Sequence, residues 1–391
     1  MTSIDIHNLE KLLDNPRREP PGVELLDGRP PLVLFGAGGR GRRILTGLRS
    51  IGILPAAFAD NAAHLAGGAV DEITVLSANE AVRLHPQAVF IVTIWSDRVG
   101  HPFEAIRNQL AALGMERVAS FTALYQKYPD VFFPDFFMDR IETILTAKHA
   151  IKAAAKLWFD AASNDEFFAQ LAMRISLDFD QLQNGANISH PAYFPTDLFT
   201  LNKAETFVDC GAYDGDTYRD FVRISGNRFR RYIAIEPDAQ NFDKLAIQTA
   251  DAGEMRVRLL KAGVAEQACV LRFSAEGSTE SRESQTGNSE VNCLTLDEIL
   301  HDETPSYIKM DIEGAELGAL RGAREILTKH RPILAVSAYH RVEDLWSVPA
   351  LINDLVMDYA LFLRPEKKAG WDLICYAVPR ERLANALGSR Q

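Results

Sequence analysis

Two segments of this 391-residue chain each run from an apolar strand through a glycine-rich turn into a segment with helical character. They are LFGAGGRGRR at residues 34–43 and FVDCGAYDGDTYRDF at residues 207–221. A glycine-rich turn between a strand and a helix lets a ligand lie against bare backbone at the start of the helix. Two such turns, far apart in the sequence, predict two sheets of the kind that holds a nucleotide-like molecule.

Strands and helices alternate around each turn. In residues 31–126, apolar segments such as PLVLFG and AVFIVTI alternate with helical segments, and RVASFTAL is expected to be the last strand. From Glu205 a second series begins, and its last two strands, ALFLRPE and LICYAVP, are separated by KKAGWD as in a hairpin. The predicted fold class is α/β, with two doubly wound Rossmann-like domains and an antiparallel hairpin at the end of the second sheet. The other strands expected in the second sheet are TFVDCG, YIAIEP, RVRLLKAGV, VLRFS, YIKMDIEG and ILAVSAYH.

The chain divides into four parts by composition and periodicity. Residues 1–29 form an N-terminal arm, and residues 30–126 form the first Rossmann-like domain. Residues 127–192 have helical periodicity and predict a helical bridge, and residues 193–391 hold the second domain. Within that domain, SAEGSTESRESQTGNSE (residues 274–290) is polar and lacks apolar periodicity, so we expect a surface loop.

Composition excludes several classes of function. Lys plus Arg is 42 and Asp plus Glu is 53, and the net charge of −11 disfavours nucleic acid as a partner. The sequence contains no run of about 18 apolar residues, so we expect no membrane span. The four cysteines contain no Cys-x-x-Cys pair, which argues against a zinc site and fits a reducing cytoplasm. We therefore expect a cytoplasmic protein with a small-molecule partner, and the sequence leaves the oligomeric state open. The cysteines are Cys210, Cys269, Cys293 and Cys375.

Acidic residues end successive strands of the second series. Asp209, Glu236 and Asp311 each stand at the end of an apolar segment. Ligands of open α/β sheets bind outside the carboxyl ends of the strands. Glu236 follows Gly211 by 25 residues, a spacing at which an acidic residue commonly accepts two ribose hydroxyls. This arrangement suits either NAD or S-adenosylmethionine.

The second glycine turn distinguishes these two cofactors. It lacks the Gly-x-Gly-x-x-Gly spacing that places a pyrophosphate on a helix N-terminus. Its carboxylates, Asp214 and Asp216, would repel a pyrophosphate and tolerate a cationic ligand. S-adenosylmethionine carries a sulfonium and an ammonium group and no phosphate, so the turn favours it over NAD.

Five segments of the second half resemble the successive motifs of the FkbM-type methyltransferases, which are S-adenosylmethionine-dependent O-methyltransferases. They are FVDCGAYDGDT, YIAIEPDAQNFDKL, CLTLDEIL, YIKMDIEGAELGALRGAREIL and RPILAVSAYH, within residues 193–379. The resemblance implies methyl transfer to a hydroxyl of a sugar or natural-product-like small molecule. It implies a cofactor site made of Asp209, Gly211, Ala212, Tyr213, Asp214, Gly215, Glu236, Pro237, Lys261, Ala262, Gly263 and Asp311.

Methyl transfer to a hydroxyl needs a base or a metal, because an alcohol is a poor nucleophile at neutral pH. His340 closes the segment ILAVSAYH at the same predicted sheet edge as Asp311, so it is our candidate general base. Lys309 is a candidate to orient the acceptor or lower its pKa. We assign Asp311 to function and Glu316 to capping of the following helix.

A metal is the alternative to a base. Asp311 with Glu313 is the candidate ligand pair for Mg²⁺, but two carboxylates at i and i+2 are a weak metal signal, so we expect catalysis without a metal. The chain departs from the family pattern before His340, where Ser337-Ala-Tyr339 stands in place of an acidic residue.

The first glycine turn carries an exact Gly-x-Gly-x-x-Gly, followed by an acidic residue at the end of the next strand. It resembles the sugar-nucleotide-binding Rossmann-like domains of some sugar-modifying enzymes, and its arginines would meet phosphate or form a solvated helix face. No pair of residues after Asp60 suggests hydride transfer, so we expect this domain to present or sense a substrate. An NAD(P)-dependent oxidoreductase and a non-catalytic ligand sensor remain alternatives to the methyltransferase. The candidate nucleotide-binding residues are Gly36, Gly38, Gly39, Arg40, Gly41 and Asp60.

Overall fold

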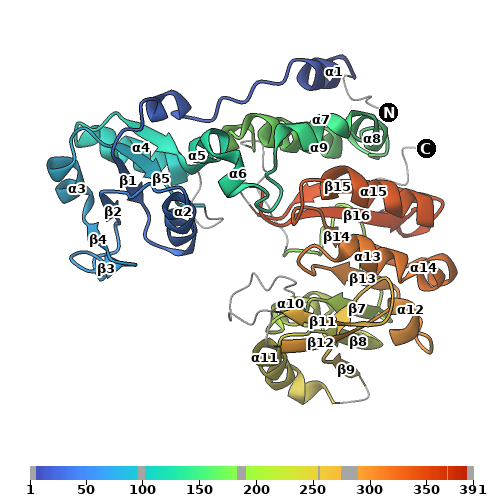
Figure 1. Cartoon of the computed structure of the whole chain (residues 1–391). Helices are drawn as coiled ribbons and strands as arrows, with labels where there is room; N and C mark the ends of the chain where they lie inside the picture. Colours follow the sequence, from blue (N-terminus) through green and yellow to red (C-terminus); the bar gives the residue numbers. More distant parts are fainter. Residues whose placement is uncertain are drawn as a thin grey trace.

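The computed structural model describes residues 6–95, 102–182, 191–253, 256–273, 289–367 and 369–384. Two α/β units lie beside one another, and a group of helices extends across both (Figure 1). The α/β fold class and the two-unit layout predicted from the sequence are confirmed. None of the described helices combines the length and the apolar run that crossing a bilayer requires.

The first sheet has six strands in the order β3-β4-β2-β1-β5-β6. The central strand β1 pairs in parallel with β2 on one side and with β5 on the other. The strand order therefore switches sides at β1, and the glycine turn follows this strand. The strands are β1 (Leu32–Phe35), β2 (Ala57–Ala59), β3 (Ala69–Val70), β4 (Ile73–Leu76), β5 (Val89–Val92) and β6 (Val118–Ser120). The accompanying helices are η1 (Val23–Leu26), α2 (Gly39–Ser50), α3 (Ala78–Leu84) and α4 (Pro102–Ala112).

The segment RVASFTAL is only partly a strand. It leaves the extended conformation at Ser120, whose hydroxyl accepts a hydrogen bond from the Thr122 backbone N–H at 3.3 Å. A serine that caps backbone N–H groups starts a helix, and the rest of the segment accordingly begins α5 (Phe121–Lys127). The apolar residues that suggested a strand are buried on this helix instead.

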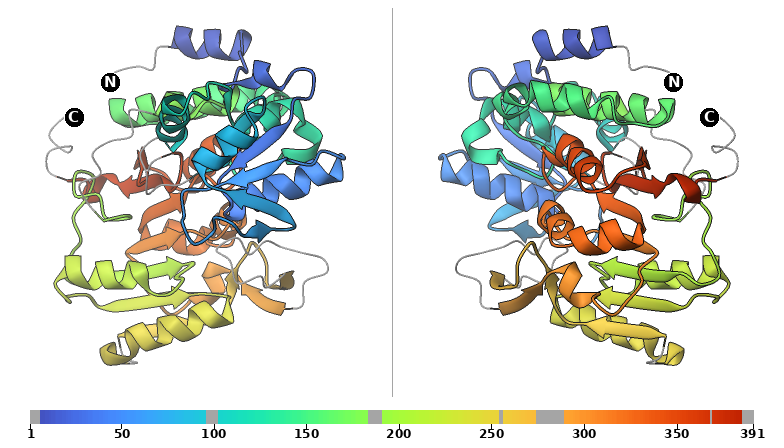
Figure 2. Two further views of the ribbon diagram at one scale, coloured as in Figure 1. Left: turned by 90° about the vertical axis from the view of Figure 1, so that its left-hand side faces the viewer. Right: turned by 90° about the vertical axis from the view of Figure 1, so that its right-hand side faces the viewer.

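The helical segment between the sheets packs on both of them. A single apolar cluster contains Leu34 of β1, Phe137 of this segment and Leu363 of the second sheet. The N-terminal helix α1 (Ile6–Asp14) lies along its outer side in all views, and Lys148 pairs there with Asp14 at 2.9 Å (Figures 1 and 2). The helices are α5, α6 (Pro129–Phe132), α7 (Ile141–Thr146), α8 (Lys148–Ala154), α9 (Ala161–Ser176) and η2 (Phe179–Leu182).

The second sheet has seven strands in the order β15-β16-β14-β13-β7-β8-β9. Neighbouring strands from β14 to β9 pair in parallel, whereas β16 is antiparallel to both β14 and β15, so the predicted terminal hairpin is present. The strands are β7 (Thr206–Cys210), β8 (Arg231–Ile235), β9 (Val257–Leu260), β13 (Tyr307–Met310), β14 (Ile333–Ser337), β15 (Tyr359–Pro365) and β16 (Leu373–Pro379). The helices are α10 (Asp216–Ser225), α11 (Ala239–Thr249), η3 (Ala250–Ala252), α12 (Leu296–Ile299), α13 (Glu316–Arg321), α14 (Arg324–His330), α15 (Asp344–Leu355) and η4 (Arg380–Arg382).

The segment RVRLLKAGV is not one strand. It breaks after β9, and its end forms β10 (Gly263–Val264) in a separate three-stranded sheet with β11 (Cys269–Phe273) and β12 (Ser289–Leu294). A Cβ at Gly263 would lie 2.6 Å from the Cys293 Sγ, so glycine permits this close parallel pairing. VLRFS therefore belongs to the small sheet. Of the expected loop at residues 274–290, residues 274–288 lie outside the described residues and the last two begin β12.

Candidate functional site

A cavity of about 980 Å³ lies at the carboxyl ends of the second sheet's parallel strands. Its walls also include residues of the first unit and of the small sheet. Lys309 and most of the predicted cofactor residues line it, whereas His340, Asp209, Ala212, Asp214 and Gly215 are not on its walls. The predicted residues that line it are Gly211, Tyr213, Glu236, Pro237, Lys261, Ala262, Gly263, Lys309 and Asp311.

The turn after β7 is held close to the end of β13. Gly211 has φ of 79°, and a Cβ on it would lie 1.9 Å from the backbone oxygen of Asp311. A side chain is therefore excluded both by the backbone conformation and by the contact. The turn ends at Gly215, with φ of 89°, which precedes α10. This explains why the chain needs glycine at two points before the helix.

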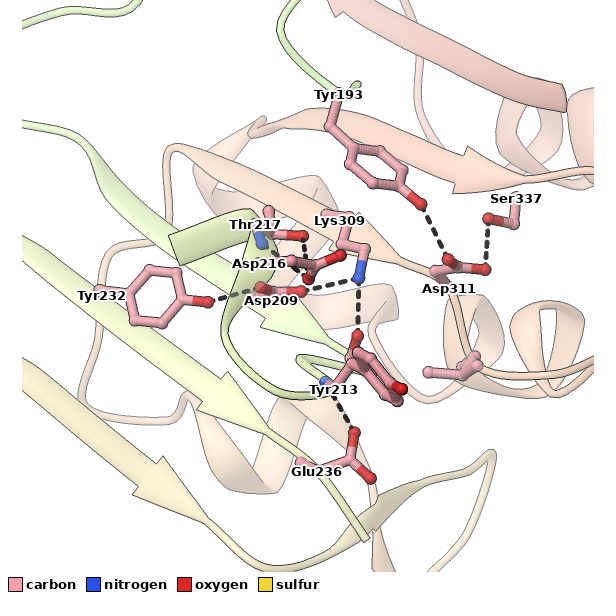
Figure 3. A network of polar contacts seen from close by, with 12 residues as sticks. Tyr193, Asp209, Tyr213, Asp216, Thr217, Tyr232, Glu236, Lys309, Asp311 and Ser337 are labelled. Carbon is pink, nitrogen blue, oxygen red and sulfur yellow. Dashed lines mark hydrogen bonds and ion pairs between the residues drawn. The ribbon is translucent and has the colours of Figure 1, made fainter. Parts of the chain in front are cut away.

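Glu236 is held in a fixed orientation at the end of β8 (Figure 3). One carboxylate oxygen accepts a hydrogen bond from the Tyr213 backbone N–H and the other from the Asp238 backbone N–H, both at 2.9 Å. Burial raises the pKa of Glu236 to about 7 despite these two hydrogen bonds. A carboxylate offers about four acceptor sites, so each oxygen can still accept one more bond. The group is thus suited to a pair of neighbouring hydroxyls.

Lys309 and Asp209 form a buried ion pair behind the turn. The Lys309 Nζ lies 2.9 Å from Asp209 Oδ1 and donates to the Gly211 carbonyl oxygen at 2.7 Å, while the Tyr232 hydroxyl donates to Asp209 Oδ2 (Figure 3). Burial lowers the pKa of Lys309, but Asp209, Asp311 and Asp216 outweigh it and raise the pKa well above the usual value. Lys309 is therefore charged and holds the glycine turn.

Asp311 follows β13 and presents its carboxylate to the cavity (Figure 3). Its Oδ2 accepts from the Tyr193 hydroxyl and its Oδ1 from the Ser337 hydroxyl, each at 2.8 Å. Burial raises the pKa of Asp311, but Lys309, His340 and the two hydroxyls outweigh burial and hold it below its usual value. Asp311 is thus an ionised carboxylate at neutral pH.

His340 comes three residues after the end of β14 and contacts Asp311 on the side away from the cavity. Its Nε2 is 3.4 Å from Asp311 and 3.8 Å from Glu313, and its Nδ1 is 2.9 Å from Glu316. Glu316 does not cap α13, which has no side-chain cap: it accepts from the Ile312 backbone N–H of the preceding turn at 2.9 Å and also holds His340, which the sequence assignment missed.

The charge of His340 conflicts with the role expected from the sequence. Burial lowers its pKa, but Glu316, Asp311 and Glu313 outweigh burial and raise it to about 10. At neutral pH the ring is therefore an imidazolium with no free lone pair to accept a proton. It also does not line the cavity. A protonated ring is a poor general base, and Asp311, unlike His340, lines the cavity, so the His340 base stays a prediction and Asp311 is a second candidate.

Three residues of this cluster lie close enough together to be tested as metal ligands. Single ligand atoms of Asp311, Glu316 and His340 lie within 4.8 Å of one another. Mg²⁺ prefers oxygen ligands and keeps several waters, so an imidazole between two carboxylates is a poor match for it. The ion pairs of His340 already account for the positions of these groups, and we assign none of them as a metal ligand.

The first glycine turn shares one feature with the second. Asp60 accepts hydrogen bonds from the Ala37 and Ala62 backbone N–H groups, both at 2.8 Å, just as Glu236 accepts from two backbone groups. A Cβ at Gly41 would lie 2.0 Å from the Gly36 carbonyl oxygen, so this glycine allows α2 to approach β1. Gly38 and Gly39 have open space around them.

Arg40 of the first turn points into the protein. Its guanidinium pairs with the buried Asp135, donates to the Tyr125 hydroxyl oxygen at 3.0 Å, and lies 4.5 Å from the centre of the Trp95 ring. Arg43 pairs with the same aspartate at 2.6 Å. Both arginines therefore join the first unit to the helical segment, which is neither the phosphate contact nor the solvated face that the sequence suggested.

Several residues of the site were not identified from the sequence. Tyr193 and Ser337 orient Asp311, and the cavity wall also contains Trp95 and Trp371. Trp95 follows β5 and so obeys the rule that ligands lie at carboxyl ends of strands, which was a usable signal. Tyr193 lies in a segment between two elements and gave no periodic signal.

Comparison with known proteins identifies the domain. Residues 209–361 match the family model of the methyltransferase FkbM domain. The crystal structure of a methyltransferase FkbM from Methylobacillus flagellatus KT superposes with a TM-score of 0.76 and 23% identity, over 95% of this chain and 97% of that chain. At this identity the likeness concerns the fold, and it includes the first unit and the helical segment.

Other solved structures match about half of the chain. An rRNA methylase from Streptococcus thermophilus (15% identity, TM-score 0.30) covers 46% of this chain and 87% of its own. Aeropyrum pernix fibrillarin, solved with natively bound S-adenosyl-L-methionine (13% identity, TM-score 0.31), covers 46% and 69%. No curated protein matches this chain. Residues 209–361 of this chain thus match the methyltransferase FkbM domain, and nearly the whole chain shares the fold of the Methylobacillus flagellatus protein.

Proposed function

We propose that the protein is an S-adenosylmethionine-dependent O-methyltransferase that acts on a hydroxyl of a sugar or natural-product-like small molecule. The observation that carries this proposal is that Glu236 and Asp311 line the same cavity. Glu236 is a carboxylate preorganised for two hydroxyls, and Asp311 is an ionised carboxylate at the end of β13. The first fits a ribose, and the second lies where a positive sulfonium is stabilised.

The residues that line the cavity fit this cofactor. Glu236 would hold the ribose hydroxyls, and the turn from Gly211 to Tyr213 offers bare backbone to the methionine part. The segment from Lys261 to Gly263 lines the wall next to Glu236 and would face the adenine. When bound, the cofactor supplies an electrophilic methyl group on a sulfonium, whose C–S bond breaks as the acceptor's O–C bond forms.

Asp311 is the proposed proton acceptor. As the acceptor oxygen gains the methyl group it becomes strongly acidic, so even a carboxylate of low pKa can take its proton. Asp311 is ionised, is fixed by the Tyr193 and Ser337 hydroxyls, and faces the cavity. His340, held by Glu316, acts through Asp311 as a positioning residue that keeps this carboxylate charged. No metal is expected in the step.

Replacement of Glu236 tests the cofactor site. We expect Glu236→Ala to weaken S-adenosylmethionine binding at least about tenfold without unfolding the protein, since two charge-assisted hydrogen bonds are lost. The pKa of Glu236 in the protein without cofactor is about 7, and hydroxyl donors bind the carboxylate better than the carboxylic acid. The affinity of the wild type for S-adenosylmethionine should therefore be highest above pH 7 and fall below it. Calorimetry between pH 6 and 8.5 would measure both effects.

Glu236→Gln is the matched control for the pH effect. The amide keeps the shape of the side chain and does not titrate, so the pH dependence of binding should disappear in this variant. Unchanged affinity in folded Glu236→Ala would remove the ribose assignment and with it the main support for the cofactor.

The intact Gly-x-Gly-x-x-Gly keeps an NAD(P)-dependent oxidoreductase as a second candidate. Asp60 has the backbone hydrogen bonds that also orient Glu236. We nevertheless expect no redox chemistry, because Arg40 and Arg43 are committed to Asp135 and cannot also serve a phosphate. Stopped-flow absorbance at the NADH band with candidate sugars should show no turnover. Hydride transfer in this assay would establish the oxidoreductase instead.

A further inference from the structure

The wall of the cavity beyond Asp311 is aromatic and comes from three separate parts of the chain. Trp95 follows β5 of the first sheet, Phe136 belongs to the helical segment, and Trp371 lies in the turn between β15 and β16. Tyr339, next to His340, lines the same cavity. The first unit therefore contributes directly to a cavity whose other end is the proposed cofactor site.

These rings are fixed against one another. The ring centres of Trp95 and Trp371 are 4.4 Å apart with an angle of 32° between the planes, and Phe136 meets Trp371 edge-on at 5.2 Å. The Trp95 Nε1–H donates to the Ala369 carbonyl oxygen at 3.0 Å, which ties the first unit to the hairpin turn. The Arg40 guanidinium lies over Trp95 and is itself held by Asp135. The wall is thus preorganised rather than dependent on exposed, freely rotating side chains.

The cavity as a whole is lined by more carboxylates than lysines. Of the described residues that line the cavity, seven carry carboxylates and three are lysines, which gives a formal balance of −4. The lysines offer little to an anion here, because Lys309 pairs with Asp209, and Lys367 pairs with Asp372 at 2.7 Å. Asp372 is buried beside Trp371, and burial and the nearby Asp311 raise its pKa, although its ion pair with Lys367 acts in the opposite direction.

We propose that Trp95, Phe136, Tyr339 and Trp371, with Asp372, form the acceptor subsite, and that its acceptor is a ring-bearing molecule with a protonated amine. Aromatic faces and an excess of carboxylates over lysines attract an ammonium group and disfavour a phosphate. The inference rests on the proposed methyl transfer and narrows its acceptor. It also gives the first unit a role as one wall of the acceptor site, in place of a separate nucleotide site.

Matched probes test the charge of the acceptor. The probes are methyl 2-amino-2-deoxyglucoside, its N-acetyl form and glucose 6-phosphate, titrated into the full chain saturated with S-adenosylhomocysteine and followed by calorimetry. We expect the amine to bind about tenfold more tightly than the N-acetyl form, because a cation over aromatic faces raises the affinity by about tenfold. We expect no binding of the phosphate. Equal binding of amine and N-acetyl forms, tighter binding of the phosphate, or no binding of the amine at millimolar concentration would overturn the proposal.

Variants test the residues. Trp371→Leu and Trp95→Phe should each weaken binding of the amine probe about tenfold while the affinity for S-adenosylhomocysteine, which also reports folding, changes less than about twofold. Asp372→Asn should reduce the preference for the amine over the N-acetyl form. Trp158→Phe is the matched control, since Trp158 is buried outside the cavity wall, and it should change neither affinity. Unchanged amine binding in both tryptophan variants would refute the subsite.

Two further measurements, of cofactor binding and of metal binding, separate failure of the proposed function from failure of the acceptor subsite. Failure of the wild type to bind S-adenosylmethionine or S-adenosylhomocysteine would contradict the proposed function itself. Tight binding of Mg²⁺ or Mn²⁺ alone that displaces the amine probe would show that a metal ion, rather than an ammonium group, balances the carboxylates, and would overturn the inference.

Discussion

Asp311→Asn should lower the rate of methyl transfer by about a hundred- to ten-thousandfold, the range expected for loss of a positioned general base. Asparagine keeps the size of the side chain and one hydrogen-bonding oxygen, but it cannot take the proton of the acceptor hydroxyl. Binding of S-adenosylmethionine should weaken much less than the rate of transfer falls, because the sulfonium loses one nearby negative charge but Glu236 and the glycine turn are not altered. Single-turnover measurement of methyl transfer, with calorimetry of the cofactor, separates the two effects. Near-normal transfer by a folded variant would remove Asp311 from the reaction.

The pH dependence of transfer distinguishes Asp311 from His340 as the base. The pKa of Asp311 lies below its usual value, so its active ionised form is complete throughout pH 6–9 and is lost only at acid pH. Transfer by an Asp311 base is then flat across that range. A His340 base with its pKa raised to about 10 would instead make transfer rise about tenfold per pH unit up to that value.

His340→Gln provides the control for this reading. Removing the imidazolium takes away one of the positive charges that hold the pKa of Asp311 low, so the acid limb of the profile should move to higher pH. EDTA should change neither profile. Loss of activity in EDTA with recovery in Mg²⁺ would show that a metal, and not Asp311 alone, serves the acceptor.

Lys309→Met should destabilise the protein by about 3–5 kcal/mol, the cost of leaving one partner of a buried ion pair uncompensated. The exposed fraction of Lys309 is 2% and that of Asp209 is 0%, so water cannot replace the lost ammonium group. The Gly211 carbonyl oxygen would also lose its donor. Urea denaturation would measure the change, and cofactor affinity should fall because the glycine turn loosens.

The destabilisation should depend on pH in a defined direction. Burial already raises the pKa of Asp209, and loss of Lys309 would raise it further. For an acid whose folded pKa exceeds its unfolded value, the penalty is absent below the unfolded pKa and grows as pH rises toward the folded pKa. The double variant Asp209→Asn, Lys309→Met removes the buried charge and should recover part of the stability. A single variant as stable as the wild type would contradict the structural role of the pair.

The sequence was informative wherever a function depends on local order. The turn from Gly211 to Gly215, Glu236 after β8 and Asp311 after β13 could each be placed because parallel strands bring their carboxyl ends to one edge. The terminal hairpin followed from two apolar segments separated by a turn. The errors arose where one residue changed the local structure, as when Ser120 capped a helix within an apolar segment that had been assigned as a strand.

The sequence by itself determined the α/β class, the two glycine turns and the strand-end carboxylates, because these depend on periodicity and on residues close together in the chain. Only the tertiary structure decided what surrounds them. It placed the Tyr193 hydroxyl and the Ser337 hydroxyl on Asp311, enclosed His340 among carboxylates that keep it protonated, and brought Trp95 against Trp371. Such contacts join residues far apart in the chain, and a pKa depends on the burial and the charges that the fold collects around a group. Periodicity carries no record of either.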